Sequence, residues 1–285
     1  MEEMMKTTKA GEELVQAKMR REITKLDDEE LWAEFEPLEI DRIESGEIKP
    51  KTLITNCGWF HSPQFRERGP LIVKEMLSVF PNSTYIKWKR RWIPNSLKDL
   101  IRIAKERECT SLVLVDTNHL GHDEICIVSL LNGAAAYFRI FNLIPREDIP
   151  DQATPPTRLD PYVRMARFAS QAGLGLSRLI QSLFPKATHS RTNKPCQKNR
   201  AFFQYQDGFV FYRHHWLHSE KAALSEERPK HTRKEVGPRF QLLFKGVKKV
   251  SLDTGSLKLI CMVIITLQSI SASFFLTYIN HLTLS

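Results

Sequence analysis

Three strand-like segments follow one another between residues 111 and 144, and they restrict the fold more than any other feature. The run SLVLVD, residues 111–116, is apolar and β-branched, which is typical of a strand buried on both faces. The segments EICIVSLL and AAAYFRIFNLI follow it and flank Asn132-Gly133, a strong hairpin-turn signal. This stretch therefore predicts three strands, the first of them inside a sheet that is covered on both faces.

Helices and strands are also predicted before this stretch. The segment KTLITN, residues 51–56, suits a strand, and a loop with Gly58, Pro63, Gly69 and Pro70 is expected after it. Apolar spacing predicts a helix over 71–80, closed by Pro81, and a second helix over 95–107. The basic segment TYIKWKRRW, residues 84–92, lies between them and is strand-like. The first half therefore reads strand, helix, strand, helix and three strands.

A proline-rich connector, IPDQATPPTRLDP, leads to a second half. GLGLSRLIQSLFP, residues 173–185, is predicted as a helix, and the alternating FFQYQDGFVFYRHHW and the segment RFQLLFKGV are predicted as strands. The helix ends LSVFP, residues 77–81, and QSLFP, residues 181–185, resemble each other. This repetition suggests an internal duplication.

The charge is divided unevenly along the chain. The net charge is +9, but residues 1–50 carry 8 Lys and Arg against 15 Asp and Glu, whereas residues 186–249 carry 15 against 5. Such a basic region attracts polyanions, and RNA, DNA and acidic lipid all qualify. The five cysteines form no CxxC pair and the first residues are charged, so we expect a reducing compartment and no secretion.

Several segments occur here in the order of a Brix domain: PKTLITNC, VFPNS, TSLVLVDTN, LLNGAAAYFRI, LGLSRLIQSLFP, GFVFYRHHW and EVGPRF. The resemblance predicts a Brix domain over residues 49–250, which leaves an atypical apolar tail over 251–285. Helix-forming composition and acidic charge predict a helical arm over residues 1–48. The resemblance also implies two pseudo-symmetric α/β halves with mixed sheets, about 49–149 and 157–250. The chain departs from the family in NGAAA at the hairpin, in a longer loop at EERPKHTRK, and after SLDTG.

Brix proteins are ribosome-assembly factors of the nucleus and nucleolus that bind pre-ribosomal RNA and a dedicated protein partner. The resemblance therefore implies that this chain joins a pre-60S particle and acts during large-subunit precursor rRNA processing, as the ribosome production factors do. The small-subunit processome branch is the alternative. Neither branch implies an enzyme, a cofactor or a metal.

Eight side chains are candidate RNA contacts. Basic residues interleaved with aromatic ones in YIKWKRRW suit phosphate contact, although the aromatic side chains equally suit a buried face. In FYRHHW, alternation places two candidates on one strand face and His214 on the other, which prevents chelation by the adjacent histidines. Structural hydrogen bonding or plain solvation are the alternative roles. The candidates are Lys87, Lys89, Arg90, Arg91, Arg178, Arg213, His215 and Arg239.

Two further segments suggest other classes of protein. Residues 259–280 contain no charged side chain and approach the length that spans a bilayer, so a tail-anchored protein is an alternative. Polar residues dilute this stretch, and the family resemblance stops where it begins. We therefore expect an alternative last exon or retained intron, no membrane insertion, and a body that lacks its last strand. The segment from His119 to Glu124 contains ligand-type side chains, but it is predicted as a polar turn.

Overall fold

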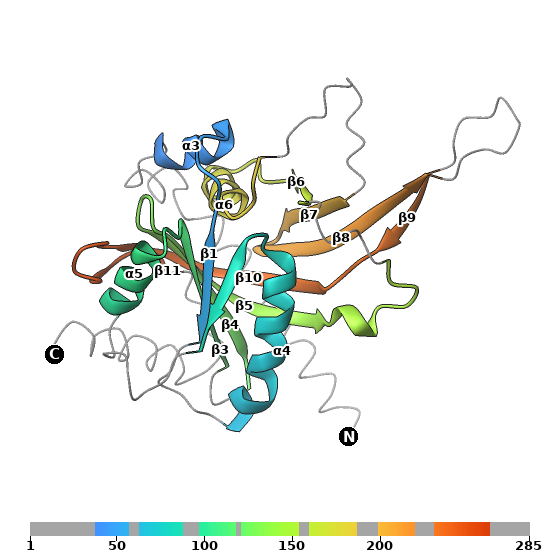
Figure 1. The fold of residues 1–285 in the computed structure, drawn as a ribbon, viewed down its shortest axis with the longest axis horizontal. Helices are drawn as coiled ribbons and strands as arrows, with labels where there is room; N and C mark the ends of the chain where they lie inside the picture. Colours follow the sequence, from blue (N-terminus) through green and yellow to red (C-terminus); the bar gives the residue numbers. More distant parts are fainter. Residues whose placement is uncertain are drawn as a thin grey trace, which may run out of the picture.

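The structure, a computed structural model, describes residues 38–56, 63–87, 97–117, 121–153, 160–186, 199–219 and 231–262 (Figure 1). The helices are α3 (Leu38–Ser45), α4 (Pro63–Val79), α5 (Leu97–Glu106), the short 3-10 helix η1 (Arg146–Asp148) and α6 (Gln171–Gln181). The strands are β1 (Thr52–Asn56), β2 (Ser83–Ile86), β3 (Ser111–Thr117), β4 (Asp123–Ser129), β5 (Ala134–Ile144), β6 (Tyr162–Ala166), β7 (Asn199–Gln206), β8 (Phe209–Ser219), β9 (His231–Glu235), β10 (Arg239–Val250) and β11 (Leu257–Met262). The predicted α/β fold is confirmed.

All described strands belong to one mixed sheet. Its order is β2-β1-β3-β4-β5-β10-β8-β7-β6, with β11 paired to β10 and β9 paired to β8. In the first half β1 and β3 are parallel, and β4 and β5 then continue antiparallel. In the second half β6 and β7 are parallel, and β8 and β10 continue antiparallel. The same order of pairing therefore occurs twice, and the antiparallel pair of β5 with β10 joins the halves.

The helices α4 and α6 occupy equivalent places in this repeat and cover the same face of the sheet. Their ends, LSVFP and QSLFP, meet there, since the rings of Phe80 and Phe184 lie 5.9 Å apart. Side chains of both helices share one core with alternate residues of the strands, such as Val113 and Phe203. The two pseudo-symmetric halves expected from the resemblance are confirmed, whereas the boundaries at 149 and 157 stay predictions.

The opposite face is covered differently in the two halves. Under β1, β3 and β4 a second core contains Leu53, Leu112 and Cys126, and α5 packs on it through Leu100 and Ile101. In the second half, none of the described helices packs apolar side chains against this face. The first half therefore has three layers and the second half two.

Asn132 and Gly133, the residues that predicted the hairpin turn between β4 and β5, also stabilise it. Asn132 Oδ1 accepts a hydrogen bond from the Ala134 backbone N–H at 3.1 Å, and Gly133 has a φ of +75°. A Cβ atom at Gly133 would lie 2.4 Å from the carbonyl oxygen of Val250, whose own N–H donates to the Gly133 carbonyl. Glycine is needed here because the turn docks closely against the end of β10.

Two expectations differ from the structure, and a third is largely untested. Helix α4 begins at Pro63, because proline is well tolerated at the first position of a helix. The loop expected at Gly69 and Pro70 is therefore wrong, since both residues lie inside this helix. Burial of Ile72, Val73 and Met76 offsets the hydrogen bond that Pro70 lacks. Strand β2 ends at Ile86, six residues before the predicted end at residue 92. A helical arm over 1–48 is seen only as α3, because residues 1–37 lie outside the described residues.

The body does not lack its last strand, contrary to expectation. Strand β11 pairs antiparallel with β10, with Val250 opposite Leu257 and Val247 opposite Cys261. This part of β10 extends beyond its pairing with β8, so its backbone groups are available to β11. In the described part of the chain, no helix is long and apolar enough to cross a membrane. Residues 263–280 of the anchor alternative lie outside that part.

Candidate nucleic-acid interface

Alternation along β8 separates three adjacent polar side chains. His214 is buried on the face covered by α6, and its Nε2 hydrogen-bonds Asn199 Oδ1 at 2.6 Å. Burial, reinforced by the charge of Arg146, lowers the pKa of His214 to about 4, so the imidazole is neutral at physiological pH. Arg213 and His215 lie on the opposite face, as predicted. The adjacent histidines therefore do not form a chelating pair.

Arg213 and His215 belong to a larger surface that we call the basic face. It comprises the side chains of β5, β6, β7, β8 and β10 that point away from α6 in the second half. Its charged, amide, imidazole and phenylalanine members include Arg139, Phe141, Arg164, Arg200, Phe202, Gln204, Gln206, Phe209, Phe211, Arg213, His215, Arg239, Gln241 and Lys245. Arg164 and Gln206 are exposed and the others in this list are partly exposed. Leu243 of β10, which lies opposite Phe209 and Arg139, is on the same side of the sheet and is buried.

The strand register arranges these side chains in rows. In one row Arg164 of β6 lies opposite Phe202 of β7, which lies opposite Arg213 of β8. In the next row Gln204, Phe211 and Gln241 are successive neighbours on β7, β8 and β10. Facing residues on neighbouring strands lie about 5 Å apart, so each ring is in reach of the polar groups beside it.

Two arginines of the basic face form no salt bridge among the described residues. Arg164 has none there, and Arg213 donates from Nη1 to the carbonyl oxygen of Tyr212 at 2.9 Å, while its charge acts on the Glu235 carboxylate without a direct contact. Cations that are not held in a salt bridge keep solution anions near them, and a polyanion can displace these anions. These two guanidinium groups are the best placed to bind phosphate.

Arg239 forms a salt bridge with Glu235. Its Nε and Nη2 donate to the two carboxylate oxygens of Glu235, both at 2.7 Å, across the Gly237-Pro238 corner between β9 and β10. This hydrogen bond raises the pKa of Arg239. Burial favours the protonated form of Glu235, but the hydrogen bonds and charge of Arg239 outweigh it and lower the pKa of Glu235. The Arg239 charge is therefore largely neutralised.

His215 lies beside this pair, opposite Glu235 in the strand register. Burial and the nearby charge of Arg233 lower the pKa of His215. The imidazole is therefore neutral near pH 7, and it offers a ring and a hydrogen bond rather than a charge.

The remaining candidates lie elsewhere. Lys87 is exposed just after β2, at the far edge of the sheet. Arg178 is exposed on α6, on the face opposite to Arg213. Lys89, Arg90 and Arg91 lie outside the described residues. The structure thus brings together Arg213, His215 and Arg239 and separates Lys87 and Arg178 from them.

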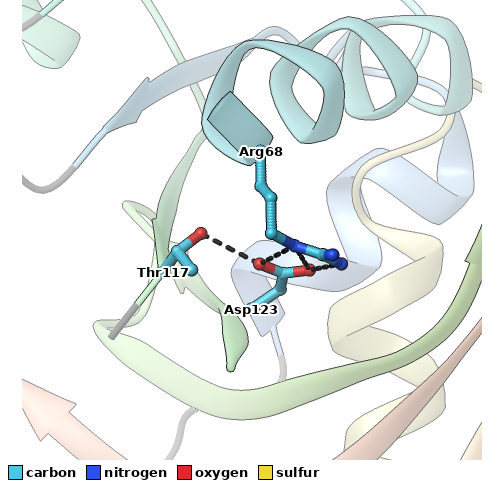
Figure 2. Close-up of polar contacts among 3 residues, drawn as sticks. All are labelled: Arg68, Thr117 and Asp123. Carbon is cyan, nitrogen blue, oxygen red and sulfur yellow. Dashed lines mark hydrogen bonds and ion pairs between the residues drawn. The ribbon is translucent and has the colours of Figure 1, made fainter. Parts of the chain in front are cut away.

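The segment considered as a metal or catalytic site contains a structural ion pair (Figure 2). Arg68 of α4 donates from Nη2 and Nε to Asp123 Oδ2, at 2.6 and 3.0 Å. Thr117 Oγ1 also donates to Asp123 Oδ1 at 2.9 Å, so both ends of the β3–β4 connection are tied to α4. Among the described residues no group of three potential ligands could hold a metal ion, and His119 lies outside them.

A model of the Brix domain matches residues 63–244. The chain belongs to the Brix family. Ribosome production factor 1 of Xenopus laevis is 26% identical over 205 residues, which cover 72% of this chain and 54% of that protein. The U3 small nucleolar ribonucleoprotein protein IMP4 of Bos taurus is 30% identical over 229 residues, covering 80% of this chain and 67% of that protein. This Brix chain spans about half the length of its ribosome production factor relatives.

A solved structure also resembles this Brix chain. It is that of a probable ribosomal biogenesis protein from Aeropyrum pernix K1, with a TM-score of 0.44 and 12% identity. The match covers 68% of this chain and 96% of the archaeal one.

Several members of the basic face were not found from the sequence of this Brix domain. Arg164 lies on β6, which neighbours β7, and Arg139 lies on β5, which is separated from β8 by β10; the pairing of β5 with β10 joins segments far apart in the sequence. One sequence signal was available: Asp207-Gly208 is a two-residue hairpin turn between Gln206 and Phe209. A hairpin at this dipeptide places Phe202 opposite Arg213. The alternating pattern alone does not reveal this pairing, because it does not set the register of the two strands.

Proposed function

We propose that this Brix chain is a ribosome-assembly protein that binds precursor ribosomal RNA during maturation of the large subunit. The observation that carries the proposal is the pair of arginines, Arg164 and Arg213, on a sheet face that no described helix covers. A nucleolar location and a place in a pre-60S particle follow from the large-subunit role. The names of the ribosome production factor 1 relatives support a role in ribosome production, and the large-subunit pathway is the finer part of the proposal.

The mechanism we propose is binding rather than catalysis. Lysine and arginine side chains neutralise RNA phosphates, and release of the condensed counter-ions supplies much of the free energy of binding. The chain then holds RNA and a dedicated protein partner together within the particle. Neither a cofactor nor a metal is required for this function.

The predicted contacts outside the basic face remain in the proposal as separate contacts. Lys87 lies at the far edge of the sheet and precedes Lys89, Arg90 and Arg91 in sequence, and Arg178 lies on α6. An RNA of precursor size is long enough to reach several sides of one domain. Replacing Arg178 with Glu tests this second group, and binding of precursor RNA should weaken modestly.

The experiment that tests the proposed function is a sucrose gradient of cell lysate containing the tagged full chain, with sequencing of the RNA in each protein-bearing fraction. We expect co-sedimentation with particles that carry large-subunit precursor rRNA. Protein that sediments without precursor rRNA, or in a detergent-sensitive membrane fraction, would contradict the proposal.

A small-subunit role is the second candidate. It is favoured by the 30% identity to a U3 small nucleolar ribonucleoprotein protein, which exceeds the 26% identity to ribosome production factor 1 of Xenopus laevis. The same gradient distinguishes the two roles. Enrichment of U3 RNA and small-subunit precursor rather than large-subunit precursor would replace the first candidate with the second.

A further inference from the structure

We infer that Phe202, Phe209 and Phe211 on the basic face form a platform on which unpaired RNA bases stack, so that the preferred ligand of this face is single-stranded RNA. The inference rests on the proposed function and adds to it the kind of RNA and the residues that select it. It starts from the distribution of aromatic residues on β7 and β8.

These two strands carry aromatic residues on both faces, and only one set is needed for the core. Phe203 and Tyr212 point toward α6 and are 1% and 0% exposed, and Tyr212 stacks on Phe240 at 4.7 Å. Phe202, Phe209 and Phe211 point the other way and keep part of their surface exposed. Apolar surface grouped on an otherwise polar face marks an interaction site more often than a folding requirement.

The rings of Phe209 and Phe211 are held in place by neighbouring rings, and all three phenylalanines are carried on strands of the sheet. The Phe209 ring lies 6.3 Å from that of Phe211 and 5.8 Å from that of Phe141. The guanidinium carbon of Arg139 lies 4.9 Å from the centre of the Phe141 ring. Rigid rings lose little conformational entropy when a ligand binds, which favours stacking.

The polar neighbours of the rings favour RNA over a protein partner. Phe202 lies between Arg164 and Arg213, two arginines that form no salt bridge in the described chain. Phe211 lies between Gln204 and Gln241, whose amides can both donate to and accept from base edges. The centre of a protein interface is usually depleted of charge, whereas cations beside aromatic rings suit phosphates beside stacked bases.

Duplex RNA does not fit this arrangement. Its bases are paired and stacked on each other, so their faces are not available to side chains. A single strand exposes every base face, and stacking tolerates any sequence. The basic face should therefore distinguish unpaired from paired RNA rather than one sequence from another.

The test measures binding of the full chain by fluorescence anisotropy to a labelled, unstructured RNA of about 12 nucleotides, within the usual site size of such surfaces. A blunt RNA duplex is the second probe. We expect the single strand to bind more tightly. Phe202→Leu and Phe211→Leu should each weaken its binding at least about fivefold, because stacking on one ring contributes ~1–3 kcal/mol. The slope of affinity against salt should not change, because no charge is removed.

Two controls separate stacking from loss of structure. Phe202→Tyr keeps an aromatic ring and should bind within about twofold of wild type, since stacking needs only the ring. Leu174→Ala removes an apolar side chain that is 45% exposed on α6 and should bind normally. Circular dichroism of each variant checks that the fold is retained.

The possible results separate this inference from the proposed function. A wild-type chain that binds neither RNA contradicts both. If Arg164→Gln and Arg213→Gln weaken binding but the leucine variants do not, or if duplex binds as tightly as the single strand, the platform is refuted and the proposed function stands. Leucine variants that bind RNA normally but no longer join the pre-ribosomal particle would make the face a protein contact and refute the platform as well.

Discussion

The two halves of this Brix domain share one order of strand pairing but differ in how their sheet is covered. In the first half α4 and α5 lie on opposite faces, and strand β3 is buried almost throughout. In the second half α6 covers one face, and the other carries the arginines and phenylalanines of the basic face. By leaving out one layer, the second half exposes a charged and aromatic sheet face, because its strands then present their second face to solvent.

The charges on this face also differ between the halves. Asp116 and Glu124 lie opposite each other at the ends of β3 and β4, on the same side of the sheet as Arg164 and Arg213. Glu124 in turn lies opposite Arg139, the first cation of the basic face. The boundary between the acidic part of this face and the basic face therefore falls at β5.

The largest effect is expected when a lysine is introduced into each half, on the sheet face opposite α4 and α6. Leu112→Lys places an ammonium group at a position that is 0% exposed beneath α5, and we expect a loss of at least ~4 kcal/mol and an unfolded chain. Phe202→Lys should fold, because the lysine stem can lie on the sheet while the charge reaches water. Thermal denaturation followed by circular dichroism measures both. Equal destabilisation would show that the second half is covered as well.

A pH-dependent effect is expected from the acidic pair. Burial, together with the charge of Glu124, raises the pKa of Asp116 to about 7, although a hydrogen bond from the Thr117 N–H opposes the shift. The native state therefore keeps a proton that the unfolded chain releases above pH 4, and stability falls as pH rises from about 4 to 7. Asp116→Asn cannot ionise and keeps the acceptor for Thr117.

The free energy of unfolding of Asp116→Asn, relative to that of wild type, should therefore rise by roughly 2–3 kcal/mol between pH 5 and pH 8, because only the wild type is destabilised as Asp116 loses its proton. Urea unfolding at the two pH values measures this difference. A difference that is the same at both values would show that Asp116 does not titrate in this range.

A smaller effect is expected from the ion pair that ties α4 to the β3–β4 connection. Arg68→Met leaves the carboxylate of Asp123, which is 4% exposed, without its cation, and we expect a loss of ~2 kcal/mol. The matched control is Lys74→Met, also on α4, whose ion pair with Glu147 is exposed on both sides. The Lys74→Met variant should lose about 0–1 kcal/mol of stability. Urea unfolding of both variants compares them, and equal losses would refute the structural role of Arg68.

The smallest effect concerns the contact between the halves. Phe80 and Phe184 end the two equivalent helices and meet at 5.9 Å, with their rings tilted by 60°. A double-mutant cycle of Phe80→Leu and Phe184→Leu should give a coupling of ~0.5–1.5 kcal/mol, typical of aromatic pairs. Coupling near zero would mean that the halves are held together by the sheet alone.

The parts of the fold that were predictable from sequence are those governed by local patterns. Strand β5 begins at Ala134 and ends at Ile144 as predicted, because the Asn-Gly turn fixes its start. Helix α5 lies inside its predicted range, because its apolar side chains repeat at helical spacing. Helix α4 was predicted too short, because Gly69 and Pro70 resemble a loop when their packing is unknown.

The basic face was less predictable, because its parts meet only through strand pairing. Arg213 and His215 were found from one alternating strand, but Arg164 and Phe202 join them through register across three strands. Arg239 was found as a conspicuous cation, yet its pairing with Glu235 depends on how the chain turns at Gly237-Pro238. Local periodicity indicates which side of a strand a residue occupies, and it does not indicate which strand lies next to it.

The pairing of β5 with β10 has a consequence for biosynthesis. Ile144 pairs with Arg239, and Ala134 pairs with Lys249, so the whole second half is translated before the edge of β5 is closed. At a translation rate of ~5–20 residues per second, this edge stays open for roughly 5–20 seconds on the translating ribosome. An open strand edge readily pairs with other chains, so the nascent protein should depend on chaperones during this interval. Truncation before β10 should therefore yield an aggregating product rather than an isolated first half.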